Sequence, residues 1–419
     1  MVEEPVCEVS NFLRAVKELF APTGKRGATS ATVSIQSEAS TFTSHRLQTS
    51  TLSAPRETAR ALILQFGWNA TAYQLLNPGI ELWFSGAGDG VVGYAIHRGM
   101  RVVGGAPVCA ADRLEPIAAE FADDAHAHGE QVCYFAAGNR LEETYAGRPD
   151  WSRVLLGAQP VWNPHSWPAA VRRRNSLRAQ FHRALNKGVV VTEWPPEKAE
   201  NHPELRRVLS QWLGARHLPP LTFMVEPETL SQLHDRRVFV AERRATEIVG
   251  FIVLSPVPAR NGWLVEQIVR GPNAPNGTAE LLIDSAMRAI AESGATYATL
   301  GLSPLSRRAE FVQLPQPLWL RFLLRWVRLH GARFYNFDGL DAFKAKFNPE
   351  IWEPIYGIAE GSRFPPRALY AIAGAFSGGT PLRLVARALL RAAREEIVSL
   401  FRRAGLRRAV GGQLHERRA

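Results

Sequence analysis

The same order of predicted elements occurs twice along the chain, and this repetition limits the fold more than any other feature. The first occurrence has strand-like runs at IELWFSG, GVVGYAIHRG and MRVVGGAPV, the helical pattern LEPIAAEFADDAHAHG and the strand-like QVCYFAAG. The second has strand-like VFVAERR, IVGFIVLSPV and GWLVEQIVR, the helical TAELLIDSAMRAIAESG and the strand-like YATLGLSP. Strands that alternate with helices are typical of α/β domains. We therefore predict two similar α/β domains that meet near residue 195.

Changes in composition set the outer limits of the two domains. Residues 1–55 are rich in Ser and Thr and poor in large apolar side chains, which predicts a flexible N-terminal lead. The first domain then covers 56–195 and the second, predicted to be catalytic, covers 196–365. In the tail, 366–419, apolar side chains recur at helical spacing and arginines fill most other positions. This pattern predicts a basic amphipathic helix.

Positive charge is concentrated in two zones of this 419-residue chain, whose net charge is +11. One zone is 381–419, with ten arginines against three glutamates, and the other is the segment VRRRNSLRAQFHRALNKG. Two such zones predict two polyanionic partners. The three cysteines include no CxxC pair, which favours a reducing compartment over a disulfide or zinc scaffold. Neither a signal peptide nor a bilayer-spanning run is apparent, so we expect a cytoplasmic protein.

The stretch RGPNAPNGTAELLIDSAM, from Arg270 to Met287, links a predicted strand to a predicted helix. Asn276 or Thr278 lies where this helix should begin, and backbone N–H groups there, with Arg270 nearby, favour an anion or a polarised carbonyl. Acyltransferases of the GNAT type hold their acyl donor at such a junction, although their loop pattern R/Q-x-x-G-x-G/A matches only loosely. The stretch predicts either a donor site or only a well-ordered turn.

The most specific stretch of the sequence is RFYNFDGLDAFKAKFNPEIWEPIYGIAEG, which begins at Arg333. It resembles the C-terminal signature of the aminoacyl-phosphatidylglycerol synthases, the family of lysyl-phosphatidylglycerol synthase and multiple peptide resistance factor. The segments APNG, LGLSPLS and LRAQFHRALNKGVVV are also similar to family segments, so the resemblance covers roughly 60–362. The residues that fit the signature are Phe334, Tyr335, Asn336, Phe337, Gly339, Leu340, Phe343, Lys344, Lys346, Phe347, Pro349, Trp352, Glu353, Pro354 and Tyr356.

This resemblance implies a tandem pair of GNAT-like domains that move an aminoacyl group from aminoacyl-tRNA to a lipid hydroxyl. It covers only the catalytic part of the family, so we expect a soluble catalytic module without the membrane-spanning half. Where the family has the acidic residue of D-x-x-R, this chain has Gln267 beside Glu266, and the transferred amino acid need not be lysine. Because an aminoacyl ester is already activated, its transfer needs positioning and proton transfer but no cofactor and no metal.

Candidate site residues come from the two motifs and from the basic segment. Arg270 and the backbone at Asn276 and Gly277 are expected to stabilise the donor, and Lys344 and Lys346 to hold phosphate. The choice of the residue that reads the α-amino group or acts as base stays open among Glu280, Glu266, Asp338 and Asp341. Catalytic roles are predicted for Arg270, Glu280, Lys344, Lys346 and Asp338. Substrate-binding roles are predicted for Glu266, Gln267, Asn276, Gly277, Ser303, Tyr335, Asn336 and Asp341. Contacts to tRNA phosphates are predicted for Arg172, Arg173, Arg174, Arg178, Arg183 and Lys187.

These assignments have structural alternatives. Lys344 and Lys346 also fit a surface beside a buried Phe343–Phe347 pair, and the basic segment also fits a solvated face. The C-terminal helix either binds an anionic membrane surface, packs on the body or dimerises. Our leading hypothesis is a peripheral membrane aminoacyltransferase whose partners are aminoacyl-tRNA and a lipid acceptor. The alternatives are a GNAT acyltransferase that uses acyl-CoA or acyl-carrier protein, and a non-catalytic RNA- or membrane-binding protein.

Overall fold

The computed structural model of the protein describes residues 53–378, apart from 216–221, 227, 245, 310, 313, 315–316, 318 and 321–336. From Ala54 onward, the described residues belong to one compact unit. The predicted N-terminal lead, the predicted C-terminal amphipathic helix, and the candidate residues Tyr335 and Asn336 lie outside the described residues. In the part of the chain that is described, no helix is both long and apolar enough to cross a bilayer.

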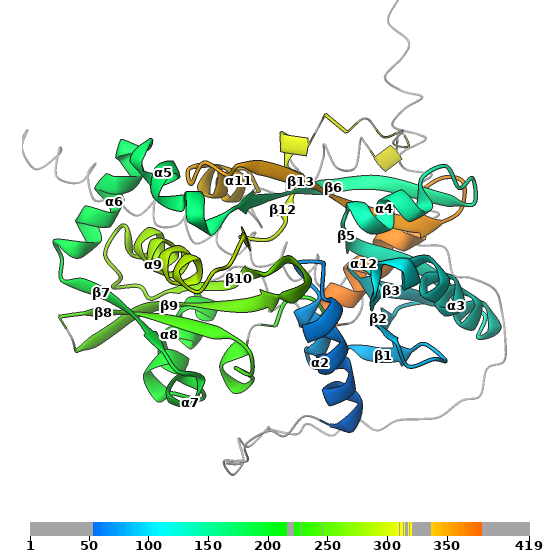
Figure 1. The fold of residues 1–419 in the computed structure, drawn as a ribbon, viewed down its shortest axis with the longest axis horizontal. Coiled ribbons are helices and arrows are strands. Elements are labelled where there is room, and N and C mark those ends of the chain that lie inside the picture. The colour runs from blue at the N-terminus through cyan, green and yellow to red at the C-terminus, as the bar shows by residue number, and fades with distance from the viewer. Residues whose placement is uncertain are drawn as a thin grey trace, which may run out of the picture. The chain divides into compact units, whose positions relative to one another are not determined.

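The described strands form one mixed sheet (Figure 1). Along the sheet, the strands follow the order β1-β2-β3-β5-β13-β6-β11-β10-β9-β8-β7, with β4 beside β2 and β12 beside β6. The strands are β1 (Glu81–Phe84), β2 (Gly90–Ile96), β3 (Met100–Gly104), β4 (Val108–Cys109), β5 (Gln131–Ala137), β6 (Trp151–Trp162), β7 (Val189–Trp194), β8 (Arg237–Arg243), β9 (Glu247–Val257), β10 (Gly262–Arg270), β11 (Tyr297–Thr299), β12 (Ser303–Pro304) and β13 (Ile351–Glu360).

Helices connect these strands. The α-helices are α2 (Ala54–Phe66), α3 (Leu114–Ala127), α4 (Asn139–Tyr145), α5 (Trp167–Arg172), α6 (Asn175–Leu185), α7 (Pro196–Ala199), α8 (Pro203–Gly214), α9 (Thr278–Glu292), α11 (Phe337–Ala345) and α12 (Pro366–Ser377). Short 3-10 helices are η1 (Tyr73–Leu76), η2 (Ala111–Arg113), η3 (Pro164–Ser166), η4 (Thr229–Ser231), η5 (Pro258–Arg260) and η6 (Arg307–Ala309).

The first half of the sheet contains a strand–helix–strand unit, β3–α3–β5, whose two strands are parallel neighbours. Helix α3 lays one apolar stripe on these strands, because its apolar residues recur three and four positions apart. Helix α3 also ends as the sequence predicts, since Gly129 follows it with a φ of 72°. The buried residues of this stripe are Leu114, Ile117, Ala118, Phe121, Ala122 and Ala125.

The second half repeats this arrangement. Strands β7, β8, β9 and β10 form an antiparallel meander, and β10 pairs in parallel with β11 after the crossover helix α9. Helix α9 buries most of its length, from Thr278 to Ile290, between the sheet and its neighbours. The α/β fold predicted from the sequence, with two units of GNAT-like element order, is confirmed.

Strand β13, which comes from the C-terminal signature, lies between β5 and β6 of the first half. One extra residue interrupts the pairing on each side of it, Ala136 in β5 and Leu156 in β6. Ala136 has a φ of 62°, and a further irregularity occurs in β10 at Glu266. Such bulges bend a strand and re-aim its side chains, often beside binding sites. This arrangement does not decide the predicted domain limits, which stay a prediction.

Candidate functional site

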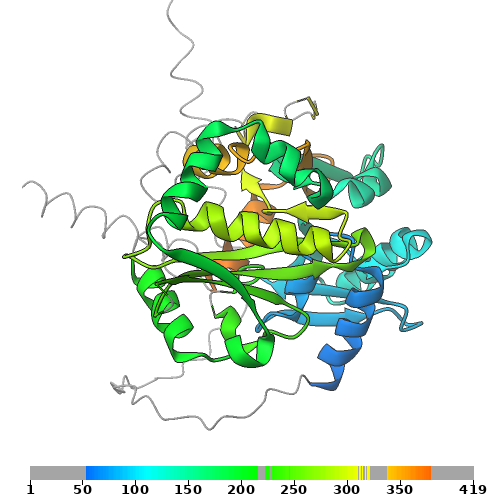
Figure 2. The same cartoon turned by 60° about the vertical axis from the view of Figure 1, so that its left-hand side comes forward.

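The loop that follows β10 packs against α6 instead of lying open. Gly277 is buried with a φ of 95°, and a Cβ atom there would lie 2.0 Å from the carbonyl oxygen of Gln180. Glycine fits this close backbone approach because it has no Cβ. Helices α6 and α9 pack together at this point (Figure 2), and the predicted role of the Gly277 backbone in donor binding stays a prediction. Arg270 and Asn276 are exposed, and their roles in donor binding stay predictions.

Lys344 is buried, which contradicts the alternative that it is a surface residue. Its Nζ atom donates hydrogen bonds to the carbonyl oxygens of Gly301, at 2.8 Å, and Leu302, at 2.9 Å. Burial lowers the pKa of Lys344 to about 7, and the nearby Asp341 carboxylate opposes this shift. A neutral amine that donates both hydrogens keeps a lone pair for a proton. The predicted phosphate contact of Lys344 stays a prediction.

Three other predicted residues of this region are engaged with protein partners. Lys346 donates to the buried carboxylate of Glu280, which lies in the first turn of α9. Asp341 accepts hydrogen bonds from the Ser306 hydroxyl, at 2.6 Å, and from Nε of Arg308, at 2.8 Å. Glu280, Lys346 and Asp341 therefore all have partners within the protein. Their catalytic and binding roles stay predictions.

Helix α11 packs against β12 and brings Lys344, Asp341 and Ser303 into one region. The Oγ atom of Ser303 is buried and has no hydrogen-bond partner among the described residues. Asp338, in contrast, is exposed in the first turn of α11. The structure thus gathers three predicted residues around the turn that follows β11 and leaves Asp338 at the surface.

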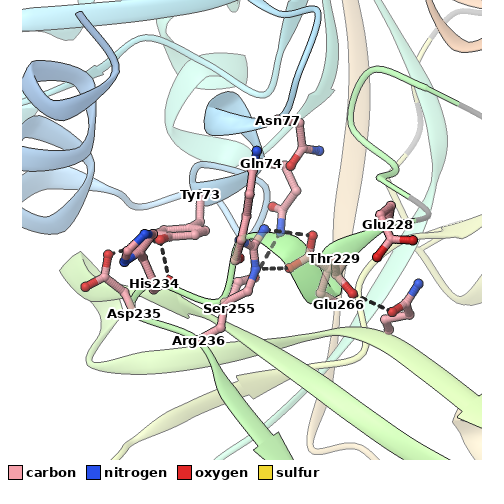
Figure 3. Close-up of polar contacts among 12 residues, drawn as sticks. Tyr73, Gln74, Asn77, Glu228, Thr229, His234, Asp235, Arg236, Ser255 and Glu266 are labelled. Carbon is pink, nitrogen blue, oxygen red and sulfur yellow. Dashed lines mark hydrogen bonds and ion pairs between the residues drawn. The ribbon is translucent and has the colours of Figure 1, made fainter. Parts of the chain in front are cut away.

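Glu266 and Gln267, at the bulge of β10, belong to a buried polar network (Figure 3). Nε of Arg236 donates to Oε2 of Glu266 at 2.9 Å, and the side chains of Arg236 and Glu266 are 4% and 9% exposed. The Thr229 hydroxyl donates to Oε1 of Gln267 at 2.7 Å. The Glu266 charge is therefore compensated by a protein cation, and the acidic position of the family motif is filled by a neutral amide.

The same network joins the first half of the chain to the second. The Tyr73 hydroxyl, in η1, donates to the backbone carbonyl of His234 at 2.6 Å and lies 3.0 Å from Oδ2 of Asp235. The Gln74 side-chain amide lies 2.9 Å from the Ser255 hydroxyl in β9 (Figure 3). Buried polar groups that satisfy one another in this way fix one packing arrangement. These contacts could not be predicted from the sequence, because none of the residues that make them belongs to a recognisable motif.

A cavity of about 210 Å³ lies at the C-terminal end of β5, beside both bulges that flank β13. Its wall combines the loop after α2, the start of α4, strand β6, residue Arg260 of η5, the turn after β11, and β13. The residues that line it are Trp68, Asn69, Ala70, Thr71, Ala136, Gly138, Asn139, Arg140, Glu143, Gln159, Arg260, Leu302, Glu353, Pro354 and Ile355.

One wall of the cavity is an ion pair whose charges cancel. The guanidinium of Arg260 donates to both carboxylate oxygens of Glu353, at 2.9 and 2.6 Å. The Gln159 amide donates to Glu353 at 2.8 Å, and the Arg260 guanidinium carbon lies 3.7 Å from the centre of the Tyr297 ring. The Glu353 carboxylate thus accepts three hydrogen bonds from protein donors, so it is held in place as part of the wall.

Other residues of the lining offer groups without such partners. The Arg140 guanidinium carbon lies 4.6 Å from the centre of the Trp68 ring, and among the described residues no carboxylate forms an ion pair with Arg140. Nδ2 of Asn69 and Oγ1 of Thr71 are buried and have no hydrogen-bond partner among the described residues. A buried polar group without a partner is destabilising, and such groups mark positions where a ligand or water completes the bonding.

The six basic residues predicted to contact tRNA lie on α5, on α6 and beside them. All six are exposed, and their hydrogen bonds are to Asn side chains, as in Arg174 with Asn348 and Arg178 with Asn175. None of the six forms an ion pair with a described carboxylate, so their charge faces solvent. The exposed residues are Arg172, Arg173, Arg174, Arg178, Arg183 and Lys187. The prediction that this face binds tRNA stays a prediction.

Comparison with known proteins assigns this chain to one protein family. The profile of the family described as phosphatidylglycerol lysyltransferase, C-terminal, matches residues 60–359. The chain belongs to this family. The matched range includes both strand–helix–strand units, the basic helix α6 and nearly all of strand β13, which walls the cavity.

Three relatives show how far the likeness to this lysyltransferase family extends. A phosphatidylglycerol lysyltransferase of Bacillus subtilis (strain 168) is 22% identical over 306 residues, which cover 72% of this chain and 35% of the relative. The chain thus spans about a third of the length of that protein. A crystal structure of the C-terminal DUF2156 domain of a protein named as a lysylphosphatidylglycerol synthetase, from Agrobacterium fabrum, superposes with a TM-score of 0.64 at 23% identity and covers 78% of this chain and 98% of that domain. The structure of L-PGS from Bacillus licheniformis gives 0.64 at 21% identity and covers 76% and 95%.

Sequence reasoning missed most residues of the cavity. Glu353 was part of the recognised signature but received no role, and Asn69, Thr71, Arg140 and Arg260 belong to no motif. One signal was present in the repeated order of elements, because it implies that the first unit has its own strand ends where a site can form. The loop after the second unit's strand carries the more recognisable pattern, RGPNAPNG.

Proposed function

We propose that this member of the lysyltransferase family transfers an aminoacyl group from aminoacyl-tRNA to the hydroxyl of a lipid such as phosphatidylglycerol. The observation that carries the proposal is the cavity at the junction of the two halves, whose wall includes Glu353 of the family signature. Relatives named as phosphatidylglycerol lysyltransferases support the lipid acceptor. The tRNA donor is supported by the exposed basic face on α5 and α6, which carries no compensating carboxylates among the described residues.

The proposed reaction exchanges one ester for another. The lipid hydroxyl oxygen bonds to the carbonyl carbon of the aminoacyl ester, the bond from that carbon to the ribose oxygen breaks, and the proton of the lipid hydroxyl passes to the ribose oxygen. Positioning of the two substrates and stabilisation of the transient oxyanion lower the barrier. Lys344 is a positioning residue in this scheme, because its Nζ holds the carbonyl of Leu302, which lines the cavity.

The acyl-CoA alternative is less well supported by the geometry. A GNAT acyl donor is held at the start of the helix that follows the central strand, and here that position is occupied by Gly277 packed on the backbone of α6. A donor bound there would have to displace α6, which shares a hydrophobic core with α9. A transfer RNA needs no such pocket, since its charged backbone can lie on the outer face of α5 and α6.

The proposal is tested by incubating the purified chain with vesicles of phosphatidylglycerol and each labelled aminoacyl-tRNA in turn. We expect label in the extracted lipid for one or a few amino acids, and loss of this product when ribonuclease is added. A parallel series with labelled acetyl-CoA and other acyl-CoAs measures the alternative. Label transferred only from acyl-CoA, or no lipid product from any aminoacyl-tRNA, would overturn the proposed function.

A further inference from the structure

We propose that the cavity binds the phosphoglycerol headgroup of the lipid acceptor, with Arg140 as the contact to phosphate and with Asn69 and Thr71 as contacts to glycerol hydroxyls. This inference rests on the proposed function, because it takes the acceptor to be a glycerophospholipid. It adds the location of the acceptor and the residues that select it. The first half of the sheet, which sequence reasoning did not treat as the reactive half, then supplies the acceptor site.

The position of the Asn69 side chain supports a built site. A Cβ atom on Gly105, at the end of β3, would lie 2.7 Å from Nδ2 of Asn69, and one on Gly138, after β5, would lie 3.0 Å from Oδ1. The amide is therefore held between the ends of two parallel strands, where glycines leave room for it. Ala136, which lies at the bulge of β5, keeps a φ of 62° on the cavity wall. Strained backbone of this kind clusters at binding sites.

Two residues of the lining, Asn69 and Thr71, have buried groups without partners, and the chemistry of these groups indicates that of the ligand. The buried Asn69 amide nitrogen donates, and the buried Thr71 hydroxyl donates or accepts, so both match alcohol or phosphate oxygens. Arg140 adds a cation that no described carboxylate pairs, whereas Arg260 and Glu353 neutralise each other. The remaining carboxylate of the lining, Glu143, is exposed and can accept from a hydroxyl. One anionic group with neighbouring hydroxyls fits this set.

The size of the cavity favours a headgroup over a nucleoside. Pockets for drug-sized ligands occupy about 300–1,000 Å³, and 210 Å³ is below that range. A glycerol with one phosphate fits such a volume, and the acyl chains would remain outside. Trp68 lines the cavity and keeps 37% of its surface exposed, with the Arg140 guanidinium over its ring. An indole at a rim of this kind suits the boundary between lipid headgroups and water.

Binding of a soluble headgroup to the full chain tests the inference without requiring turnover. The probe is glycerophosphoglycerol, the deacylated headgroup, and its dissociation constant is measured by calorimetry for the wild type, Arg140→Gln and Thr71→Val. We expect binding to weaken about tenfold or more in Arg140→Gln, which loses a charge-assisted hydrogen bond, and severalfold in Thr71→Val. Arg148→Gln, a change of a half-buried arginine just after α4 that pairs with Glu115 and does not line the cavity, serves as the control and should bind like the wild type. Thermal melts confirm that each variant is folded.

Separate arms distinguish the sources of a phosphate signal. Inorganic phosphate and a CCA trinucleotide are titrated in the same way, and glycerophosphoglycerol should bind more tightly than either. If CCA binds instead and its affinity falls in Arg140→Gln, the cavity takes the end of the tRNA and the inference is overturned. Equal binding of the headgroup to wild type and Arg140→Gln also overturns it.

Turnover on phosphatidylglycerol vesicles separates this inference from the proposed function. Arg140→Gln should raise the KM for the lipid about tenfold and leave the KM for aminoacyl-tRNA unchanged. If the wild type transfers amino acids to lipid and the lipid KM is the same in Arg140→Gln, the proposed headgroup site is overturned and the proposed function is supported. If the headgroup binds through Arg140 but no aminoacyl lipid forms, the proposed function is overturned and the headgroup site is supported.

Discussion

Two strand–helix–strand units of this sheet share one topology but end differently. In β3–α3–β5 and in β10–α9–β11, a crossover helix joins two parallel strands. After β10, the chain turns at Gly277 against the backbone of α6. At the ends of β3 and β5, Gly105 and Gly138 leave room for Asn69, and a cavity follows. The end of β10 is closed by helix α6, whereas the ends of β3 and β5 border a cavity that is open to a ligand.

This difference shows what topology decides and what it does not. The order of elements fixes where two parallel strands end, and such ends are common places for a binding site. Segments from elsewhere in the chain then decide whether the end is filled. Helix α6 fills one end with its backbone, while the loop 68–71 approaches the other with small polar side chains. A functional role therefore cannot be transferred from one unit to its counterpart on topology alone.

Replacing Gly277 by alanine should have the largest effect on stability, because Gly277 forms the contact between α6 and the loop after β10. The new Cβ atom would lie 2.0 Å from the Gln180 carbonyl oxygen, and alanine is strained at a φ of 95°. We expect the free energy of unfolding, measured by urea denaturation, to fall by about 3–4 kcal/mol. The control is Gly294→Ala, where φ is 84° but no atom lies within 4 Å, with an expected loss of about 1–2 kcal/mol. Equal losses would show that α6 does not close the end of β10.

Two ion pairs, Arg236 with Glu266 and Arg260 with Glu353, should also contribute differently to the free energy of unfolding. Glu266→Gln leaves the buried guanidinium of Arg236 without a charged partner, and we expect unfolding free energy to fall by about 3 kcal/mol. Glu353→Gln leaves Arg260 on a cavity wall where its side chain is 18% exposed, so water can solvate it and the loss should be about 1–2 kcal/mol. Urea denaturation of both variants measures the contrast. A larger loss of unfolding free energy for Glu353→Gln would mean that Arg260 on the cavity wall is less accessible to water than Arg236.

Much of the fold was predictable because its signals are local. The spacing of apolar residues in α3 and α9 and the glycines between strands are set within a few positions, and the helix at α6 also agrees with its predicted basic segment. The insertion of β13 between β5 and β6 was not predictable, since pairing between strands far apart in sequence has no local pattern.

The candidate site was predicted only in part. Lys344, Asp341 and Ser303 do lie together, because one signature and one strand carry them. The burial of Lys344, the pairing of Lys346 with Glu280 and the neutral partner of Gln267 depend on side chains from other elements. Asn69, Thr71 and Arg140 could not be found from single residue types, which occur throughout the surface of any protein. A cavity is a property of several distant segments, and no one of them contains its signal.

A smaller effect concerns Lys344, which anchors the turn after β11. Its pKa is about 7 in the folded chain and near 10.5 when unfolded, because burial disfavours the charged amine. The unfolded chain thus binds more protons between these values, and this residue makes the free energy of unfolding rise as pH increases from 7 to 10, with no contribution to the slope below 7. Lys344→Met should remove a rise on the order of a few kcal/mol, measured by urea denaturation across pH.

The exposed Lys198 of α7 supplies the control for this measurement. Lys198→Met should keep the slope that Lys344 contributes, because Lys344 is unchanged in this variant. If Lys344→Met and the wild type show the same slope between pH 7 and 10, Lys344 is charged in the folded chain. The lone pair that makes it a possible proton acceptor would then be absent, and its role would be limited to holding Gly301 and Leu302.

The smallest expected effect comes from a substitution on the outer face of α6, the helix that packs against the loop after β10. Arg183 is exposed and makes no ion pair with a described residue, so its replacement should leave stability within about 0.5 kcal/mol. If the closing helix also receives the tRNA, Arg183→Gln should weaken tRNA binding severalfold and make the plot of log affinity against log salt shallower by roughly 0.7–0.9, the release of one phosphate's counterions. Filter binding across salt concentrations measures this slope, and Arg148→Gln should leave it unchanged. An unchanged slope for Arg183→Gln would mean that α6 closes the end of β10 without serving as the donor surface, and tRNA would then have to approach from the side of the open cavity.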